Sequence, residues 1–221
     1  METPRIAILI PAFNEEGTIG AVIEGALMFG DVFVSDDGST DSTSQFSKAH
    51  GAMVLTQGSN YGYSSALSFG LSVIIAEGYQ LIVTIDADGQ HDPADIGHFI
   101  SHLIADSDIV VGRRPTCARL MERVFGLLTA TLSSVSDPLC GMKGFRAELL
   151  KAKGTLETYD SVGTEILVYA IAKNYRVTVV SINAGTREGA PRFAGKLRAN
   201  FLIGMALANG VWKFLAFKLQ S

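Results

Sequence analysis

Two aspartates one residue apart follow an apolar segment in the first half of the chain. The segment Leu81–Ile85 is typical of a buried strand, and Asp86 and Asp88 come directly after it. On a turn beyond a strand, two carboxylates with this spacing can approach one ion. Mg²⁺ and Mn²⁺ prefer such oxygen ligands, and substrate phosphates usually complete their coordination. An Asp-x-Asp next to Gly89 is also a common turn, so the motif alone leaves both interpretations open.

Two more polar loops precede this one in the sequence. Residues 35–41 contain Asp36 and Asp37, whose carboxylates can accept hydrogen bonds from a base N–H or from ribose hydroxyls. An acidic N-cap with a tight turn is the alternative interpretation. Residues 11–16 could form the wall of a nucleobase site, or only the beginning of a helix.

The elements that must position these loops alternate between short apolar segments and helical patterns. This alternation predicts a mostly parallel sheet with helices on both faces, and such sheets bind ligands at the carboxyl ends of their strands. Strands are expected at Ile6–Ile10, Val32–Ser35, Met53–Thr56, Leu81–Ile85, Ile109–Gly112 and Val177–Ile182. Helices are expected at Thr18–Phe29, up to His50, at Tyr63–Glu77, after Asp92-Pro93, at Leu120–Val135 and Gly163–Lys173, and from Leu197. The irregular segments 113–119, 136–146 and 184–196 are expected at the rim of the site.

The composition predicts a single domain, residues 1–221, with an acidic half and a basic half. Hydrophobic residues make up 48% of the 221 residues and charged ones 18%, so a large core is available. Residues 1–112 carry 15 acids and two bases, whereas residues 113–221 carry seven acids and 16 bases. An acidic half suits a cation site, and a basic half suits a phosphate-bearing partner. We expect no nucleic acid partner.

Several common motifs are absent from the sequence. It contains no G-x-G-x-x-G, no P-loop, no H-E-x-x-H and no G-x-S-x-G, which argues against standard dinucleotide enzymes, P-loop enzymes, zincins and common hydrolases. Two cysteines and no signal-peptide pattern at the N-terminus favour a cytoplasmic protein. No segment reaches the roughly 18 apolar residues of a membrane span, although the tail at 201–217 could lie on a membrane surface.

Taken in order, the three loops resemble glycosyltransferase family 2. That family has a Pro-x-Tyr/Phe-Asn-Glu segment, an Asp-Asp-Gly-Ser-x-Asp segment and an Asp-x-Asp segment, which stand here at 11–15, 36–41 and 86–88. Asn60–Ala66 matches a further Asn-x-Gly-x-x-x-Ala stretch. Asp137–Arg146 is similar to the Asp…Ser-Gly-Phe-Arg element of the polyprenyl-phosphate sugar transferases, such as dolichol-phosphate mannosyltransferase. The resemblance extends from residue 5 to about residue 196 and implies a Rossmann-like domain of the GT-A type.

The resemblance also implies a function for the loops. It implies an inverting transferase that takes a hexose from a GDP- or UDP-sugar and depends on Mg²⁺ or Mn²⁺. The implied metal ligands are Asp86, Asp88 and Gln90. The implied donor-binding residues are Pro11, Ala12, Phe13, Asn14, Glu15, Asp36, Asp37, Gly62, Asp86 and Ala87. Asp88 and Asp137 are the catalytic candidates, with Asp137 as the base if the acceptor is a hydroxyl.

The acceptor expected from the resemblance is a polyprenyl phosphate at the cytoplasmic face of a membrane. Such a phosphate is already ionised near neutral pH, so its site needs cations more than it needs a base. The candidate cations are Arg114, Arg119, Arg123, Arg146, Arg187 and Lys196. A hydroxyl acceptor and a non-catalytic nucleotide-sugar-binding subunit are the alternatives. One departure from many relatives is Tyr63, which stands where they have lysine.

Overall fold

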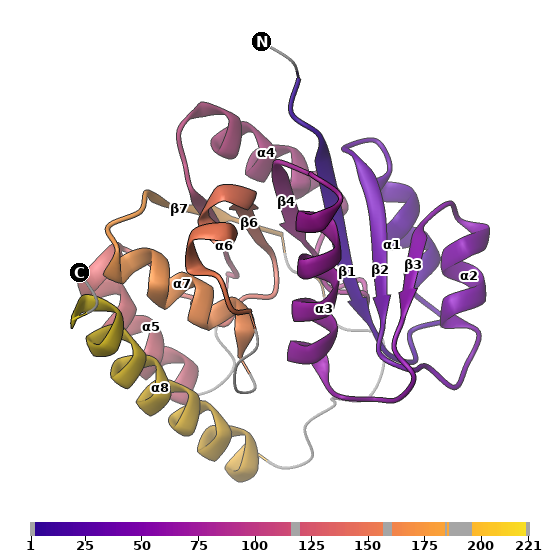
Figure 1. Cartoon of the computed structure of the whole chain (residues 1–221). Coiled ribbons are helices and arrows are strands. Elements are labelled where there is room, and N and C mark those ends of the chain that lie inside the picture. Colours follow the sequence, from indigo (N-terminus) through magenta and orange to yellow (C-terminus); the bar gives the residue numbers. More distant parts are fainter. Residues whose placement is uncertain (1–2, 116–119, 157–160, 184, 186–195, 220–221) are drawn as a thin grey trace.

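Seven strands form one sheet in the part of the chain that the structure describes. The structure is a computed structural model that describes residues 3–115, 120–156, 161–183, 185 and 196–219. The strands lie in the order β3-β2-β1-β4-β6-β5-β7 (Figure 1). Their bounds are β1 Ile6–Ala12, β2 Asp31–Asp36, β3 Met53–Thr56, β4 Leu81–Thr84, β5 Ile109–Arg113, β6 Lys143–Arg146 and β7 Val177–Ser181.

The strand β6 departs from the pattern expected from the sequence. It lies in the segment 136–146, which was predicted to be irregular, and it runs antiparallel between β4 and β5. The other neighbouring strands pair in parallel, as predicted. The register pairs Thr84 with Lys143 and Leu81 with Arg146. The beginning of β6 therefore lies beside the carboxyl end of β4, whereas Arg146 lies beside the amino end of β4.

Helices cover both faces of the sheet, which agrees with the predicted α/β class. Their bounds are α1 Ile19–Ala26, α2 Thr43–Ala49, α3 Tyr63–Ala76, α4 Ile96–Ala105, α5 Leu120–Ser133, α6 Ala147–Lys153, α7 Val162–Ala172 and α8 Lys196–Leu219. A 3₁₀ turn, η1 (Pro93–Asp95), precedes α4. The helices α1 and α4 pack on one face, and α3, α6 and α7 pack on the other.

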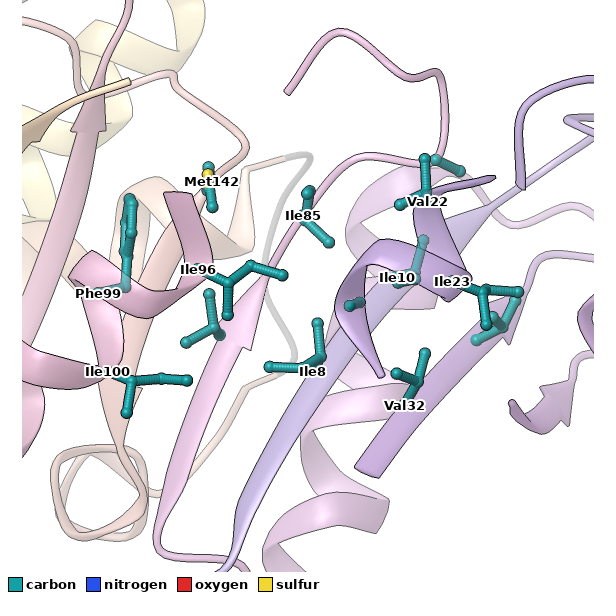
Figure 2. Packing of buried hydrophobic residues seen from close by; sticks show 14 of the residues in the cluster. Ile8, Ile10, Val22, Ile23, Val32, Ile85, Ile96, Phe99, Ile100 and Met142 are labelled. Carbon is teal, nitrogen blue, oxygen red and sulfur yellow. The ribbon is translucent and has the colours of Figure 1, made fainter. Parts of the chain in front are cut away.

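Alternation along β1 divides the core into two layers. Ile8 and Ile10 point to the face covered by α1 and α4, where Figure 2 shows them among Val22, Ile23 and Ile96. Ala7 and Leu9 point to the other face. Successive side chains of a strand point to opposite faces, so a strand that is buried on both sides is apolar throughout. This explains why the first strands could be recognised as continuous apolar segments.

The helical spacing of Ile96, Phe99, Ile100, Leu103 and Ile104 predicts an apolar inner face for α4 and places Asp95 on the opposite face, and the structure differs from this at two positions. Ile96, Phe99, Ile100 and Leu103 are buried as expected, but Ile104 is exposed. Asp95, which the helical spacing places on a solvated face, is buried and accepts a hydrogen bond from the Asn183 backbone N–H at 2.9 Å. The end of β7 is thereby fixed to the loop that follows β4.

The order of the first strands creates a switch point in the sheet. From β1 the chain continues to β2 and β3 on one side, and β4 then pairs with the other side of β1. Open α/β sheets generally bind ligands in a crevice beside such a point, at the carboxyl ends of the strands. The arrows of β1 and β2 end at the lower edge of the sheet in Figure 1, where the loops that follow them lie.

The last helix, α8, packs against α7 and α5 (Figure 1). The Phe217 ring packs edge-to-face on Tyr169 of α7, with ring centroids 5.2 Å apart. Among the described residues, no helix is both long enough and apolar enough to span a membrane.

Candidate active site at the ends of β1, β2 and β4

The carboxylate of Asp86 lies just beyond the end of β4 and has defined neighbours. Its Oδ1 accepts a hydrogen bond from the Tyr63 hydroxyl at 3.0 Å, and Tyr63 is the first residue of α3. The Asp86 side chain keeps 27% of its surface exposed. Burial of the hydroxyl and the nearby Asp86 carboxylate raise the pKa of Tyr63, so the phenol stays protonated and remains a donor. The tyrosine that replaces a lysine thus orients the first aspartate of the motif.

A buried histidine stands on the other side of the same carboxylate. His91 is almost fully buried, and its Nδ1 is 3.6 Å from Oδ2 of Asp86. This nitrogen has no hydrogen-bond partner among the described residues. Groups around a metal-binding carboxylate commonly orient it in this way. Neither Tyr63 nor His91 was among the predicted site residues.

Asp88 and Gln90 occupy the turn that follows Asp86. Asp88 is largely buried, and its Oδ1 accepts a hydrogen bond from the Gln90 backbone N–H at 3.1 Å. The carbonyl of Ala87 accepts a hydrogen bond from the Thr18 hydroxyl at 2.7 Å, and the carbonyl of Gln90 accepts one from the Gly185 N–H at 2.8 Å. The motif loop is therefore tied to the beginning of α1 and to residue 185.

The donor set at this turn is compatible with a hard divalent cation. Asp86 keeps one carboxylate oxygen without a hydrogen bond of normal length, on a partly exposed side chain. No cluster of three or more His, Cys, Asp or Glu suited to a metal ion is present among the described residues. A cation held by one or two carboxylates together with substrate phosphates does not need such a cluster of protein ligands.

The loops after β1 and β2 are joined by hydrogen bonds. The Asn14 N–H donates to the Ser39 hydroxyl at 2.9 Å, and the Asn14 side-chain oxygen accepts from the Thr40 N–H at 2.8 Å. Asn14 has a positive φ of 53°, a conformation that asparagine tolerates better than most residues. The Glu15 N–H donates to the Thr43 hydroxyl at 2.8 Å. The predicted residues Pro11, Ala12, Phe13, Asn14 and Glu15 therefore lie beside the Asp36 loop.

The two aspartates at the end of β2 have different environments, although both are almost fully buried. Asp36 accepts one hydrogen bond, from the Ser39 N–H at 3.0 Å. Asp37 accepts two, from the N–H groups of Tyr61 and Gly62 at 2.8 and 2.7 Å. Gly62 has φ +95°, which favours glycine. Asp37 therefore positions the beginning of α3, and with it Tyr63, whereas Asp36 retains one oxygen that could contact a donor.

Two residues predicted for different roles, Arg114 and Asp137, bind each other. The Arg114 guanidinium donates to both oxygens of Asp137, at 2.8 and 2.9 Å, and Asp137 is only 2% exposed. Hydrogen bonding to Asp137 raises the pKa of Arg114, which remains charged. A carboxylate engaged at both oxygens by a guanidinium is a poor general base, so the structure favours a structural role for Asp137 over the predicted one.

The structure describes the side chains of two of the other predicted acceptor-binding cations, Arg146 and Arg123. Arg146 lies beside the amino end of β4, opposite to the acidic loops. Its guanidinium donates to the carbonyls of Leu103 and Ser107, so the structure does not bring it to the candidate site. Arg123 is exposed on α5. Arg119 and Arg187 lie outside the described residues, as does the side chain of Lys196.

Gly141 makes the closest approach to Asp86. A β-carbon at this position would overlap both carboxylate oxygens and would lie 2.6 Å from the carboxylate carbon. The carbonyl of Gly141 accepts a hydrogen bond from the Thr84 hydroxyl at 2.8 Å, which fixes the segment before β6 against the end of β4. A glycine is therefore required here for Asp86 to keep its position.

We expect Gly141→Ala to reduce sugar transfer by about tenfold or more, since a displaced ligand typically costs 10- to 100-fold in metal affinity or activity. The measurement is the rate of nucleotide-sugar turnover as a function of Mn²⁺ concentration. Gly17→Ala is the matched control, because a β-carbon at Gly17 has no neighbour within 4 Å. If both variants showed the same dependence of turnover on Mn²⁺ concentration, the contact between Gly141 and Asp86 would not matter for activity.

The fold, with acidic loops at its switch point, is that of a glycosyltransferase of the GT-A type. Residues 7–125 match the family model described as glycosyl transferase family 2, and the chain belongs to this family.

Named relatives and solved structures are similar over most of the chain. An uncharacterised glycosyltransferase of Mycobacterium tuberculosis is 29% identical over 213 residues, which cover 91% of this chain and 95% of the relative. The polyprenol monophosphomannose synthase of Mycolicibacterium smegmatis is 25% identical over 222 residues, with 87% and 82% covered. The fold also matches glucosyl-3-phosphoglycerate synthase of Mycobacterium tuberculosis, solved with Mn²⁺, UDP and glucosyl-3-phosphoglycerate (TM-score 0.77, 20% identity, 96% and 80% covered).

Proposed function

We propose that this glycosyltransferase moves a hexose from a UDP- or GDP-sugar to a polyprenyl phosphate at a membrane surface, with Mg²⁺ or Mn²⁺ bound at Asp86 and Asp88. The observation that carries the donor half of the proposal is the position of Asp86 at the switch point, oriented by Tyr63. Several similar relatives are named for transfer to lipid phosphates, among them the polyprenol monophosphomannose synthase and a dodecaprenyl-phosphate galacturonate synthase.

Different residues of the candidate site would bind different parts of the donor. Asp36 and the loop at residues 11–15 would hold the nucleoside, and Asp86 and Asp88 would hold the cation on the diphosphate. The cation, when bound, stabilises negative charge on the leaving nucleoside diphosphate. Tyr63 keeps Asp86 oriented, and Asp37 keeps Tyr63 in place through the backbone of residues 61–62.

The reaction is a direct displacement at the anomeric carbon. An acceptor oxygen forms a bond to that carbon while the bond to the donor phosphate breaks, and the nucleoside diphosphate leaves with the electron pair. An ionised phosphate acceptor has no proton to lose, so this route needs no general base. Because both oxygens of Asp137 are bound by Arg114, the structure supports the phosphate acceptor better than the hydroxyl alternative.

A binding and transfer assay tests the proposal. The protein is titrated with UDP- and GDP-sugars by calorimetry, with and without MnCl₂, and is then incubated with radiolabelled donor and undecaprenyl phosphate in detergent. We expect metal-dependent binding of one nucleotide and an organic-soluble labelled product. Absence of metal-dependent nucleotide binding would favour a non-catalytic subunit, and donor turnover without a lipid product would overturn the acceptor assignment.

The outer surfaces of α5 and α8 support a membrane-bound acceptor. Leu127 is 70% exposed on α5 and Trp212 is 75% exposed on α8, and further apolar side chains are exposed on the same two helices. The helix α8 contains no acid, and the one acid of α5, Glu122, is buried. Arg123 and Lys218 are exposed on these helices. A surface of apolar and cationic side chains with an exposed tryptophan suits anionic lipid headgroups.

We expect Trp212→Glu to weaken binding to vesicles that contain anionic lipid, because it removes apolar contact and adds a repelled charge. The measurement is co-sedimentation with phosphatidylglycerol vesicles at low and moderate salt. Met28→Glu is the control, since Met28 follows α1, away from α8 in the sequence, and its side chain is about as exposed as that of Trp212. Equal sedimentation of both variants and the parent protein would exclude α8 as the membrane contact.

A further inference from the structure

One buried lysine has no place in the donor site described above. Lys143 is the first residue of β6 and is only 4% exposed. Its ammonium donates to the Cys140 carbonyl, and no carboxylate of the described residues forms an ion pair with it. Burial lowers the pKa of Lys143, while the neighbouring Cys140, Asp137 and Asp86 act in the opposite direction. A buried amine of this kind is costly to charge without a counter-ion, so a bound anion would favour its ammonium form.

A small cavity contains this lysine and adjoins the donor site. Its volume is about 160 Å³, and its walls include Lys143, Tyr63 and Gly141. Tyr63 and Gly141 also contact Asp86. A buried water needs only about 10–15 Å³ of such space, so the cavity has room for several heavy atoms. A phosphate group fits within it.

The chemistry of the cavity wall is that of an anion site. No Asp or Glu is among its described lining residues, whereas Ser64, Ser161 and Thr164 are. The Ser64 hydroxyl accepts a long hydrogen bond from the Val162 N–H, and the Thr164 hydroxyl donates one to the Pro138 carbonyl. The helix α7, eleven residues long, begins in the same wall at Val162. The N-terminus of a helix favours negative charge. The lysine, the hydroxyl-bearing residues and the helix terminus together favour an anion in this cavity.

We propose that Lys143 and the beginning of α7 bind the phosphate group of the acceptor in this cavity, beside the cation-binding carboxylate of Asp86. The inference rests on the proposed function and adds a subsite to it. An ionised phosphate oxygen held there attacks the anomeric carbon, and the donor phosphate leaves with the electron pair. Lys143 neutralises the acceptor and takes no proton. A larger groove of about 860 Å³ between α3 and residues 150–156 shares Ser64 and Val162 with the cavity, and we assign it to a substituent on the phosphate.

Lys143→Met tests the subsite because it removes the ammonium and keeps an unbranched side chain in the core. The probe is geranyl phosphate, titrated by calorimetry with and without Mn²⁺ and nucleotide, and geraniol is the phosphate-free comparison. We expect Lys143→Met to weaken geranyl phosphate binding by about ten- to a hundredfold, the range for hydrogen bonds to charged groups. Nucleotide binding with Mn²⁺ should stay within about twofold, and Lys48→Met, on the exposed surface of α2, should change neither.

A second variant keeps the ammonium and reduces the space. A β-carbon at Gly163 would lie 3.7 Å from Nζ of Lys143 and 3.6 Å from Leu67, which is ordinary contact distance. Gly163→Ala should therefore fold, and it should weaken geranyl phosphate binding in the same direction as Lys143→Met. This variant tests the cavity even if Lys143→Met does not fold.

The outcomes separate this inference from the proposed function. Geranyl phosphate binding no tighter than geraniol binding, or equal binding by the parent protein and both cavity variants, would overturn the subsite. Phosphate binding that depends on Lys143, without any nucleotide binding, would support the subsite and overturn the proposed function. Transfer assays then identify the source of the phosphate. Lys143-dependent transfer to undecaprenyl phosphate supports the lipid, and Lys143-dependent transfer to glycerol 3-phosphate alone supports a soluble ester.

Discussion

Asp86→Asn should lower the rate of sugar transfer by about a thousandfold. A bound cation supplies several kcal/mol of stabilisation to the charge on the leaving group, and each 1.4 kcal/mol corresponds to a factor of about ten in rate. Asparagine keeps an oxygen that can accept the Tyr63 hydrogen bond, now 3.0 Å long, but it removes the negative charge. The measurement is donor turnover at saturating nucleotide sugar over a range of Mn²⁺ concentrations.

Removal of the metal from the parent protein should have the same effect as this substitution. Chelation with EDTA should abolish transfer, and added Mn²⁺ or Mg²⁺ should restore it, whereas the residual activity of Asp86→Asn should be insensitive to both. Asp92→Asn is the matched control in the same loop. Asp92 caps η1 by accepting a hydrogen bond from the Ala94 N–H at 2.9 Å, and asparagine caps helices equally well. Metal-dependent turnover in Asp86→Asn close to that of Asp92→Asn would remove Asp86 from the metal site.

Asp137→Ala should lower the free energy of unfolding by about 2–3 kcal/mol. Removing one partner of a buried ion pair typically costs about 3–5 kcal/mol, and the value here is reduced because the Arg114 side chain is 27% exposed and water screens it. For a chain of this size, each 1 kcal/mol shifts the melting temperature by about 2–4 °C. The expected decrease is therefore about 4–12 °C, measured by circular dichroism or calorimetry.

An exposed ion pair provides the comparison for this substitution. Arg176 pairs with Asp106, and both side chains are more than half exposed, so Asp106→Ala should cost less than about 1 kcal/mol. An Asp137→Asn variant that melts like the parent protein and yet fails to transfer sugar would contradict the structural role. Such a result would return Asp137 to the role of general base.

The sequence was sufficient to predict the strands that are buried on both faces. The strands β1, β2, β4 and β5 stand out as apolar segments because they are buried almost throughout. The edge strands β3 and β7 are less buried but were also predicted from their apolar residues. The strand β6 could not be recognised, because its four residues begin with Lys143 and end with Arg146. Both charges are accommodated only by tertiary contacts, with the Cys140 carbonyl and with the carbonyls of Leu103 and Ser107.

The predictions of the site divide in the same way. The order of the loops could be predicted from the sequence. The structure places the Asp36 loop, the residues after β1 and the Asp86 turn together at the carboxyl ends of neighbouring strands. The contacts of Asp86 with Tyr63 and Gly141 could not be predicted, because these residues are 23 and 55 positions away in the sequence. The pairing of Arg114 with Asp137 likewise depends on tertiary geometry. Spacing therefore indicated which residues bear charge, but not which charges neutralise each other.

The antiparallel insertion of β6 has a consequence for how the chain is assembled. Because β6 bridges β4 and β5, the acidic and basic halves share one continuous ladder of backbone hydrogen bonds. A polypeptide ending at residue 112 would leave one edge of β4 bare and would lack the glycine that borders Asp86. Bare edges of this kind promote association between chains. During synthesis, the nucleotide crevice can therefore be completed only after residue 146 has emerged from the ribosome.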